Sequence, residues 1–283
     1  GYRKEVPPCA RALKRGDCEM PVRYGIVGVG AWSRATHIPN LLKVEEARIG
    51  ALCSRSEENR LAGRELCPEA PLLFDRWEEL LACESVDAVI IAVPNALHAR
   101  RSIEALKAGK DVLCEKPVAL TDQDARELKR TVRQTERVFA AGYELRSADV
   151  VRAARRTIEN GDLGEVLMIS GRFYRSWGAF DSGWRGDTAL SGGLVPEVYS
   201  HTADLQTHLA GELPVLVSAR GAAAGGPPYW DRLVVTSHYS AGTLSVGELC
   251  LNASGAEENY PLEICGTEGR LVGDVVEGRV ELI

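Results

Sequence analysis

The sequence predicts an α/β protein in which a doubly wound parallel sheet is followed by an α+β domain with a largely antiparallel sheet. Strand-like and helix-like segments alternate over residues 21–142, as they do in a parallel sheet with crossover helices. A glycine-rich turn, Gly28-Val29-Gly30, follows the first strand-like segment. After residue 142, strand-like segments succeed one another with few helices between them, which is typical of antiparallel pairing.

The first domain, residues 21–142, contains one segment that is especially informative, residues 86–93. Its sequence is almost continuously apolar, as a strand covered by helices on both faces must be. Thr121 is expected to cap a later helix, since acidic residues in the following turn complement the helix dipole. In chain order we expect strand 23–27, helix 31–42, strand 47–53, helix 57–66, strand 86–93, helix 98–108, strand 111–114, the helix capped by Thr121, and a buried strand 138–142.

The second domain, residues 143–283, is expected to begin with a helix over 148–160, which Gly161 ends. Its strands are expected at 165–174, 215–220, 233–239, 243–251, 262–265 and 269–276. Residues 1–20 are rich in Arg and Lys, show no periodicity and are interpreted as an N-terminal extension.

Composition excludes several classes of protein. A chain of 283 residues with 45% hydrophobic and 26% charged residues has the balance of a soluble globular protein of two domains. No run approaches the ~20 apolar residues that cross a bilayer, and the first 20 residues lack the apolar core of a secretory signal. The net charge of −6, without a basic stripe, argues against nucleic acid as a partner. The eight cysteines include no Cys-x-x-Cys pair, so we expect reduced thiols in a cytoplasmic protein and no metal site.

The glycine turn predicts a dinucleotide site in a Rossmann-type domain. Gly28 permits the tight turn, and Gly30 lets the backbone approach a pyrophosphate at the start of the helix that opens with Ala31 and Trp32. Ser33 stands where a third glycine is usual.

The choice of cofactor depends on the end of the second strand. Ser54 and Arg55 stand there in place of the carboxylate that would bind the ribose 2′-hydroxyl of NAD. A guanidinium suits a 2′-phosphate, so NADP is favoured, with NAD as the alternative if Arg55 is only a solvated loop residue.

Several motifs together resemble one enzyme family. They are Pro94-Asn95 with His98, Ala108-Gly109-Lys110, Glu115-Lys116-Pro117, His37-x-Pro39, Gly164-Glu165-Val166 and Trp184-Arg185. In combination they resemble the Gfo/Idh/MocA oxidoreductases, the glucose–fructose oxidoreductase and inositol dehydrogenase family, over residues 24–205. The resemblance implies that Pro94, Asn95, His98 and Glu115 help to bind the cofactor.

The resemblance also implies a catalytic set. Lys116 and His201 would assist proton transfer while hydride passes between a carbinol carbon and nicotinamide, and Glu197 would orient one of them. Glu197, His201 and Asp204 follow helical spacing, which predicts that they share one face. The alternatives are a strand-end surface lysine, a histidine satisfied within its helix and a solvated carboxylate.

Other residues are expected to line a substrate pocket, or else to pack between domains: Arg146, Tyr174, Trp184, Arg185 and Tyr199. Glu197 stands where the family has aspartate, and Tyr199 where it has a glycine near the active centre, so the ring could narrow the pocket. The usual Phe-x-Pro after Arg146 is absent. The chain stops at Ile283, whereas the family usually continues through a further helix.

Three functions agree with these observations. The first is an NAD(P)-dependent oxidoreductase acting on a small polyol, sugar or carbonyl substrate; the second is a cofactor-binding sensor or regulatory protein without turnover; the third is an oxidoreductase acting on an imine. A homo-oligomer formed through the C-terminal sheet is also expected, with the alternating segments 233–237 and 243–246 as its face. These segments could equally cover the core of their own domain.

Overall fold

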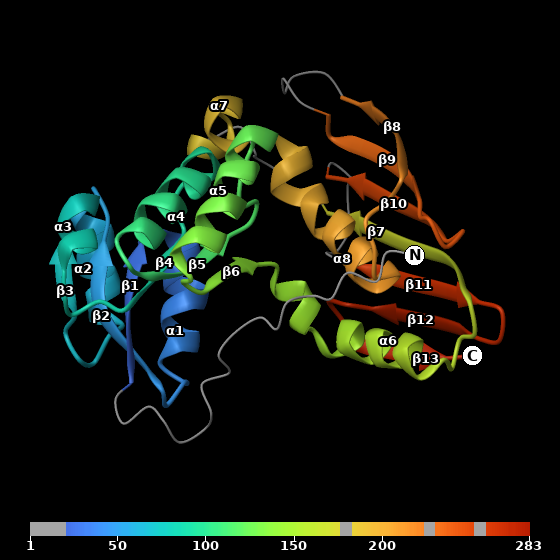
Figure 1. Ribbon diagram of the computed structural model, residues 1–283, viewed down its shortest axis with the longest axis horizontal. Coiled ribbons are helices and arrows are strands. Elements are labelled where there is room, and N and C mark those ends of the chain that lie inside the picture. Colours follow the sequence, from blue (N-terminus) through green and yellow to red (C-terminus); the bar gives the residue numbers. More distant parts are fainter. Residues whose placement is uncertain (1–20, 176–182, 224–229, 252–258) are drawn as a thin grey trace. The chain divides into compact units, whose positions relative to one another are not determined.

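The computed structural model describes residues 21–175, 183–223, 230–251 and 259–283 (Figure 1). A boundary between Gly142 and Tyr143 divides the chain into two compact units. The segment 1–20, interpreted above as an extension, lies outside the described residues.

The first unit contains a six-stranded, wholly parallel sheet in the order β3-β2-β1-β4-β5-β6. Its strands are β1 Val22–Val27, β2 Ala47–Cys53, β3 Leu72–Phe74, β4 Ala88–Ile91, β5 Asp111–Glu115 and β6 Phe139–Gly142. This order confirms the predicted Rossmann-type fold. Successive strands are added on one side of β1 up to β3 and on its other side from β4 onward. Doubly wound proteins bind their ligands in the crevice at the carboxyl ends of the strands where this change occurs.

Helices cover both faces of this sheet, so it has two apolar cores. One core packs Trp77, Ile103 and Leu128 against the sheet, and the other packs Val29 and Ile38 against its opposite face. The helical elements are η1 Ser33–His37, α1 Ile38–Leu41, α2 Glu57–Glu65, α3 Trp77–Ala82, η2 Asn95–Leu97, α4 His98–Lys107 and α5 Asp122–Thr135. The Oγ1 atom of Thr121 accepts a hydrogen bond from the backbone N–H of Asp124 at 3.1 Å, which is the cap that the sequence predicts.

The structure differs from expectation in two places here. Strand β3 and helix α3 were not predicted, because each is too short to show a clear period. The expectation that β6 is buried is wrong: Ala140 and Ala141 are exposed, because β6 is the edge strand of the sheet and has only one neighbour.

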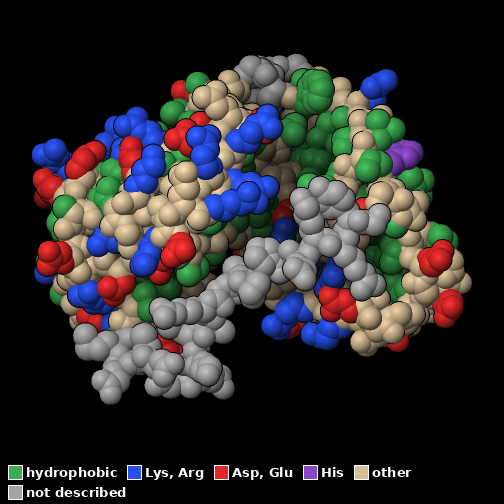
Figure 2. All heavy atoms as spheres, in the orientation of Figure 1, with side chains coloured by type: hydrophobic (Ala, Val, Ile, Leu, Met, Phe, Trp, Pro, Cys, Tyr) green, Lys and Arg blue, Asp and Glu red, His purple; other side chains and the backbone are tan. Residues whose placement is uncertain are grey.

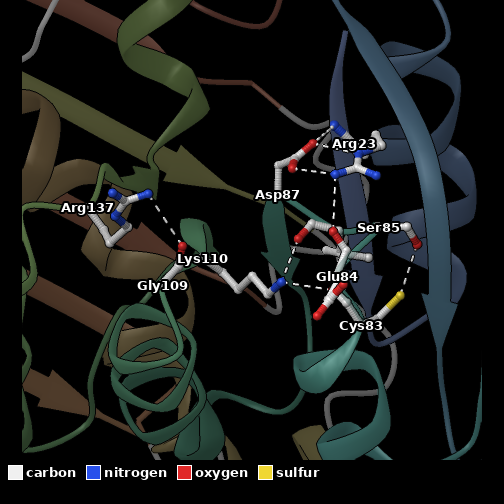
Figure 3. Close-up of polar contacts among 9 residues, drawn as sticks. Arg23, Cys83, Glu84, Ser85, Asp87, Gly109, Lys110 and Arg137 are labelled. Carbon is white, nitrogen blue, oxygen red and sulfur yellow. Dashed lines mark hydrogen bonds and ion pairs between the residues drawn. The ribbon is translucent and has the colours of Figure 1, made fainter. Parts of the chain in front are cut away.

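Lys110 fastens the amino end of this sheet (Figure 3). Its Nζ atom donates to the carbonyl oxygens of Cys83 at 2.9 Å and Val86 at 2.6 Å. In the same cluster, Nε of Arg23 donates to Oδ2 of Asp87 at 2.9 Å. The lysine of the Ala-Gly-Lys motif therefore holds the loop before β4, at the end of the sheet opposite the glycine turn.

The second unit contains a seven-stranded sheet in the order β13-β12-β11-β7-β10-β9-β8. Its strands are β7 Val166–Tyr174, β8 Leu216–Ala222, β9 Arg232–His238, β10 Leu244–Cys250, β11 Pro261–Gly266, β12 Arg270–Asp274 and β13 Arg279–Leu282. The pair β7–β10 is parallel and the other pairs are antiparallel, which confirms the largely antiparallel prediction. Strand β13 was not predicted.

Two helices, α6 Asp149–Asn160 and α8 Ser200–Ala210, pack on one face of this sheet around a core that includes Ile169 and Ile264. Shorter helical elements are η3 Glu144–Ser147, η4 Gly183–Arg185, α7 Thr188–Ser191 and η5 Val195–Tyr199. Both η1 in the first unit and η5 in the second are π-helical turns. In such a turn the backbone hydrogen bonds join residues five apart, where an α-helix joins residues four apart.

The surface and the hydropathy give two further facts. On the face shown in Figure 2, basic and acidic side chains are interspersed over the first unit. Among the described residues, no helix combines the length and the apolar character that spanning a membrane requires.

Candidate functional site

The turn after β1 has the geometry of a dinucleotide-binding turn. Gly28 has φ +91°, and a Cβ atom there would lie 2.2 Å from the carbonyl oxygen of Ala92, so only glycine fits. Among the described residues, a Cβ atom at Gly30 would meet no atom within 4 Å apart from its own chain neighbours. Ser33, which replaces the third glycine, donates from Oγ to the carbonyl oxygen of Gly28 at 2.6 Å and ties the turn to the helix. The space above Gly30 is therefore open to a ligand.

Glu115 joins the first helix to the end of β5. Its Oε1 atom accepts a hydrogen bond from Nε1 of Trp32 at 2.8 Å and lies 2.9 Å from Nε2 of His37. Burial by itself would raise the pKa of Glu115, but the contacts with His37 and Trp32 and the charge of Lys116 outweigh it and hold the pKa below its usual range. Glu115 is thus an ionised anchor between the end of β5 and the first helix, and the indole of Trp32 is committed to it.

His98 joins the loops that follow β4 and β5. Its Nδ1 atom lies 2.7 Å from the carbonyl oxygen of Pro117, and its Nε2 atom lies 2.8 Å from that of Val93. His98 and Asn95 are both buried, so His98 acts through the backbone rather than as an exposed ligand. Lys116 lies between Glu115 and Pro117 and is partly buried at this carboxyl edge of the sheet.

At the end of β2 the structure places two arginines, Arg34 and Arg60, in addition to the predicted Arg55. Arg55 is exposed, as a ligand-binding loop residue would be, and Ser54 is half-buried. Arg60 donates from its guanidinium to the carbonyl oxygen of Ser54, and Arg34 donates to Oδ1 of Asn59. Spacing alone gave no signal for Arg34 or Arg60, because the fold brings them to this edge from two different helices.

In the second unit, His201 and Asp204 of α8 both face the segment 143–146. The ring of Tyr143 meets the His201 ring edge-on at 6.2 Å between centroids, and Oε1 of Glu144 lies 4.0 Å from Nδ1 of His201. Arg146 holds Asp204 with two hydrogen bonds, Nε to Oδ2 at 2.7 Å and a second from NH2 to Oδ1 at 2.5 Å. These contacts place the segment that precedes α6 beside the predicted catalytic histidine.

Glu197 has a different neighbour. Its Oε1 atom accepts a hydrogen bond from Nε of Arg185 at 3.1 Å, and the Arg185 guanidinium lies 4.5 Å above the ring of Trp184. Glu197 lies in the π turn 195–199, directly before α8, and His201 and Asp204 lie in α8 itself, so the shared face stays a prediction. The bond from Arg185 ties Glu197 to η4.

Two of the predicted pocket residues are engaged elsewhere. Tyr199 is buried in a core with Val198 and Leu249, and a Cβ atom at Gly247 would lie 2.3 Å from its Oη atom. The ring of Tyr199 therefore fills space that a glycine on β10 leaves open. Tyr174 donates from its hydroxyl to Oε2 of Glu248 on the neighbouring strand.

Comparison with known proteins follows the same division into two units. The family profile described as "Oxidoreductase family, NAD-binding Rossmann fold" matches residues 22–143, and that of the "GFO/IDH/MocA C-terminal domain" matches residues 151–272. A 2,7-anhydro-N-acetylneuraminate hydratase from Mediterraneibacter gnavus is 32% identical over 265 residues, which are 90% of this chain and 68% of that protein. The chain belongs to the Gfo/Idh/MocA oxidoreductase family.

Other members of the family are also similar to this chain. Levoglucosan dehydrogenase from Pseudarthrobacter phenanthrenivorans is 28% identical over 75% of this chain and 63% of its own length. The WlbA dehydrogenase from Bordetella pertussis, solved in complex with NADH and UDP-GlcNAcA, superposes with a TM-score of 0.85. Its sequence identity is 22%, and the match covers 93% of this chain and 77% of that one, so this likeness concerns the fold. The chain thus spans somewhat less than two thirds of levoglucosan dehydrogenase, and 59% of a 1,5-anhydro-D-fructose reductase from Ensifer adhaerens.

Proposed function

We propose that this protein is an NAD(P)-dependent oxidoreductase that transfers a hydride between nicotinamide and a small sugar, polyol or carbonyl substrate. The observation that carries the proposal is the position of Lys116. Lys116 follows β5 at the same carboxyl edge of the sheet as the Gly28 turn. The residue before it, Glu115, is bonded to the first helix, and the carbonyl oxygen of the residue after it, Pro117, is held by His98. Relatives named for sugar derivatives support a sugar or polyol as the substrate.

The residues present fit a dinucleotide. The open space at Gly30 and the start of the helix after it suit a pyrophosphate, and Pro94 and Asn95 follow β4 beside the point where the strand order reverses. When bound, the nicotinamide supplies or accepts the hydride. The protein must then orient the substrate and move one proton.

We assign the proton to Lys116 and His201. Oxidation of an alcohol needs a base for the hydroxyl proton, and reduction of a carbonyl needs an acid at the same oxygen. An ammonium and an imidazole can each do this, and Oε1 of Glu144 lies 4.0 Å from Nδ1 of His201. Glu197, held by Arg185, supplies a fixed carboxylate on the same helix. Tyr199 is left out of the substrate-binding set because its ring lies in the core.

The proposal is tested with the full chain, NADP⁺ and NAD⁺, and a panel of sugars, polyols and their ketones. Absorbance at 340 nm reports reduced cofactor, and NMR of the substrate reports turnover that leaves the cofactor unchanged, since one relative is named as a hydratase. We expect turnover that Lys116→Met and His201→Gln abolish while cofactor binding survives. Lys107→Met, which removes an exposed lysine from the end of α4, is the matched control. Full turnover in both site variants would refute the assignment.

We propose NADP as the preferred cofactor. The support is the absence of a carboxylate at Ser54 and Arg55, together with the guanidinium groups of Arg34 and Arg60 at the same edge. A family description that names NAD and solved relatives that bind NADH make NAD the competing cofactor, so the two are measured side by side.

We also propose a cytoplasmic homo-oligomer that pairs through the outer face of the C-terminal sheet. The six cysteines in the described part of the chain are free thiols, which suits a reducing compartment. In segments 233–237 and 243–246 the residues alternate: Leu233 and Val235 face the core, while Val234 and Leu244 are exposed. Light scattering with Val234→Lys and Leu244→Lys tests this, since a single face of an oligomer would be disrupted by both.

A further inference from the structure

We propose that the substrate of this site carries an anionic group, a carboxylate on the sugar or polyol, and that Arg185 binds it. This inference rests on the proposed function and narrows its substrate class. It concerns residues of the second unit alone.

Arg185 is held in place before any ligand arrives. Its Nε atom donates to Glu197, and its guanidinium lies over the ring of Trp184. Its side chain is nevertheless 45% exposed, whereas that of Glu197 is 5% exposed. The guanidinium of Arg185 is therefore accessible to solvent, whereas the carboxylate of Glu197 is not. Within the described part of the chain, the side-chain contacts of Arg185 engage Nε and the face of the guanidinium, which leaves the edge formed by its two terminal nitrogens available.

A fixed guanidinium edge favours a planar anion over a hydroxyl. Two parallel N–H groups match the two oxygens of a carboxylate, and hydrogen bonds between charged groups are about twice as strong as neutral ones. Because the stacking on Trp184 and the pairing with Glu197 already order the side chain, binding loses little further conformational entropy. A flexible lysine at this position would lack both advantages.

The charges around His201 indicate which end of the substrate lies beside it. Glu144 is 50% exposed and lies 4.0 Å from Nδ1 of His201, so it repels an anion at that end. Arg146 is 46% exposed, but both its Nε and NH2 atoms are committed to Asp204, which is 10% exposed. Arg185 is therefore the better anion site. Glu197, which holds Arg185, and His201 are four residues apart in one continuous helical stretch. We therefore place the carboxylate of the sugar at Arg185 and its carbinol at His201.

The test compares acids with matched neutral compounds on the full chain, in the presence of NADPH for binding and NADP⁺ for turnover. The pairs are methyl glucuronide with its methyl ester, and gluconate with glucitol. Binding is followed by ligand-observed NMR, and turnover at 340 nm. We expect at least one acid to bind about 10- to 100-fold better than its neutral partner in the wild type. Arg185→Gln should bring that ratio close to one, while the weaker binding of the neutral partner changes little.

Two further variants keep the result interpretable. Arg185→Lys retains the charge opposite Glu197 but loses the two-pronged edge, so we expect an intermediate ratio. Arg152→Gln removes an exposed arginine from α6, which is paired with Asp149, and should leave the ratio at its wild-type value. Added salt should lower the preference in the wild type and not in Arg185→Gln.

The outcomes separate this inference from the proposed function. Turnover of neutral sugars with no acid bound better than its partner overturns the inference and leaves the oxidoreductase standing. A preference for acids that Arg185→Gln does not reduce also overturns it. Acid binding that depends on Arg185, without any turnover, supports the inference and counts against the oxidoreductase.

Discussion

The Nε2 atom of His37 lies 2.9 Å from Oε1 of Glu115, so the helix after the glycine turn is fastened to the strand end that carries Lys116. The indole N–H of Trp32 reaches the same oxygen from one turn earlier in that helix. The glycine turn and Lys116, which we propose as the catalytic lysine, are therefore coupled through one largely buried carboxylate.

Replacing this carboxylate should loosen the first unit in a manner that depends on pH. Glu115→Gln removes charge-assisted bonds, and we expect the free energy of unfolding at pH 7 to fall by about 1–3 kcal/mol. The pKa of Glu115 is lower in the folded chain than in the unfolded one. Its contribution is therefore fully present above the unfolded pKa, about 4.3, and is lost as the pH falls through the folded value. Urea unfolding of both proteins at pH 7 and at pH 4 checks this; an equal difference at both would contradict it.

The two glycines of the turn should respond differently to the same change. Gly28→Ala forces an alanine to φ +91° and against the Ala92 carbonyl, so the positive φ alone should cost about 1–3 kcal/mol of stability. The methyl group of Gly30→Ala meets no non-adjacent atom within 4 Å in the part of the chain that the structure describes, so stability should stay within about 0.5 kcal/mol of wild type. The substitution should nevertheless weaken NADPH binding strongly, because its methyl group enters the space assigned to the pyrophosphate. Thermal melts and NADPH fluorescence separate the two effects, and normal NADPH binding by Gly30→Ala would move the cofactor elsewhere.

Two lysines at opposite ends of β5 should have opposite roles. Lys116→Met should lower kcat by about 10²- to 10⁴-fold with little change in the melting temperature. Lys110→Met removes the side-chain donor from the carbonyl oxygens of Cys83 and Val86 (Figure 3), although the Cys83 oxygen keeps the backbone N–H of Val86 at 3.3 Å. It should lower the free energy of unfolding by about 1–3 kcal/mol and leave the kcat of the folded fraction unchanged. Loss of kcat in the folded Lys110→Met protein would show that the amino end of the sheet is not merely structural.

Charge reversal at the end of β2 should change the cofactor preference. Arg55→Asp places a carboxylate where one binds the 2′-hydroxyl of NAD, so we expect NADPH binding to weaken about 10- to 100-fold and NADH binding to hold or improve. Arg64→Asp, at an exposed position near the other end of α2, makes the same charge change away from the site. Similar losses for both cofactors in Arg55→Asp would argue against a 2′-phosphate site there.

The first unit could be predicted in most of its elements because its signals are local. The apolar run before Pro94, the Thr121 cap and the glycine turn each depend on neighbours a few residues away. The elements that were missed, β3, α3 and β13, are short, and their burial is decided by distant parts of the chain rather than by their own period.

The candidate site was predictable in its motifs but not in its pairings. The motifs pointed to Lys116, His201 and Glu197. That Glu115 binds His37, or that Arg146 binds Asp204, depends on how far-separated segments meet. The pairing of Glu197 with Arg185 could not be predicted either, because Arg185 lies in a separate short helical element, η4.

The π turns at residues 33–37 and 195–199 each hold one supernumerary residue within an otherwise ordinary helix. Such a residue shifts the phase of everything before it by about 100° relative to everything after it. Deleting one residue from Val195–Tyr199 would leave His201 and Asp204 on their present neighbours but swing Glu197 away from Arg185. Alignments that place a gap in this helix would for the same reason equate side chains that face different directions.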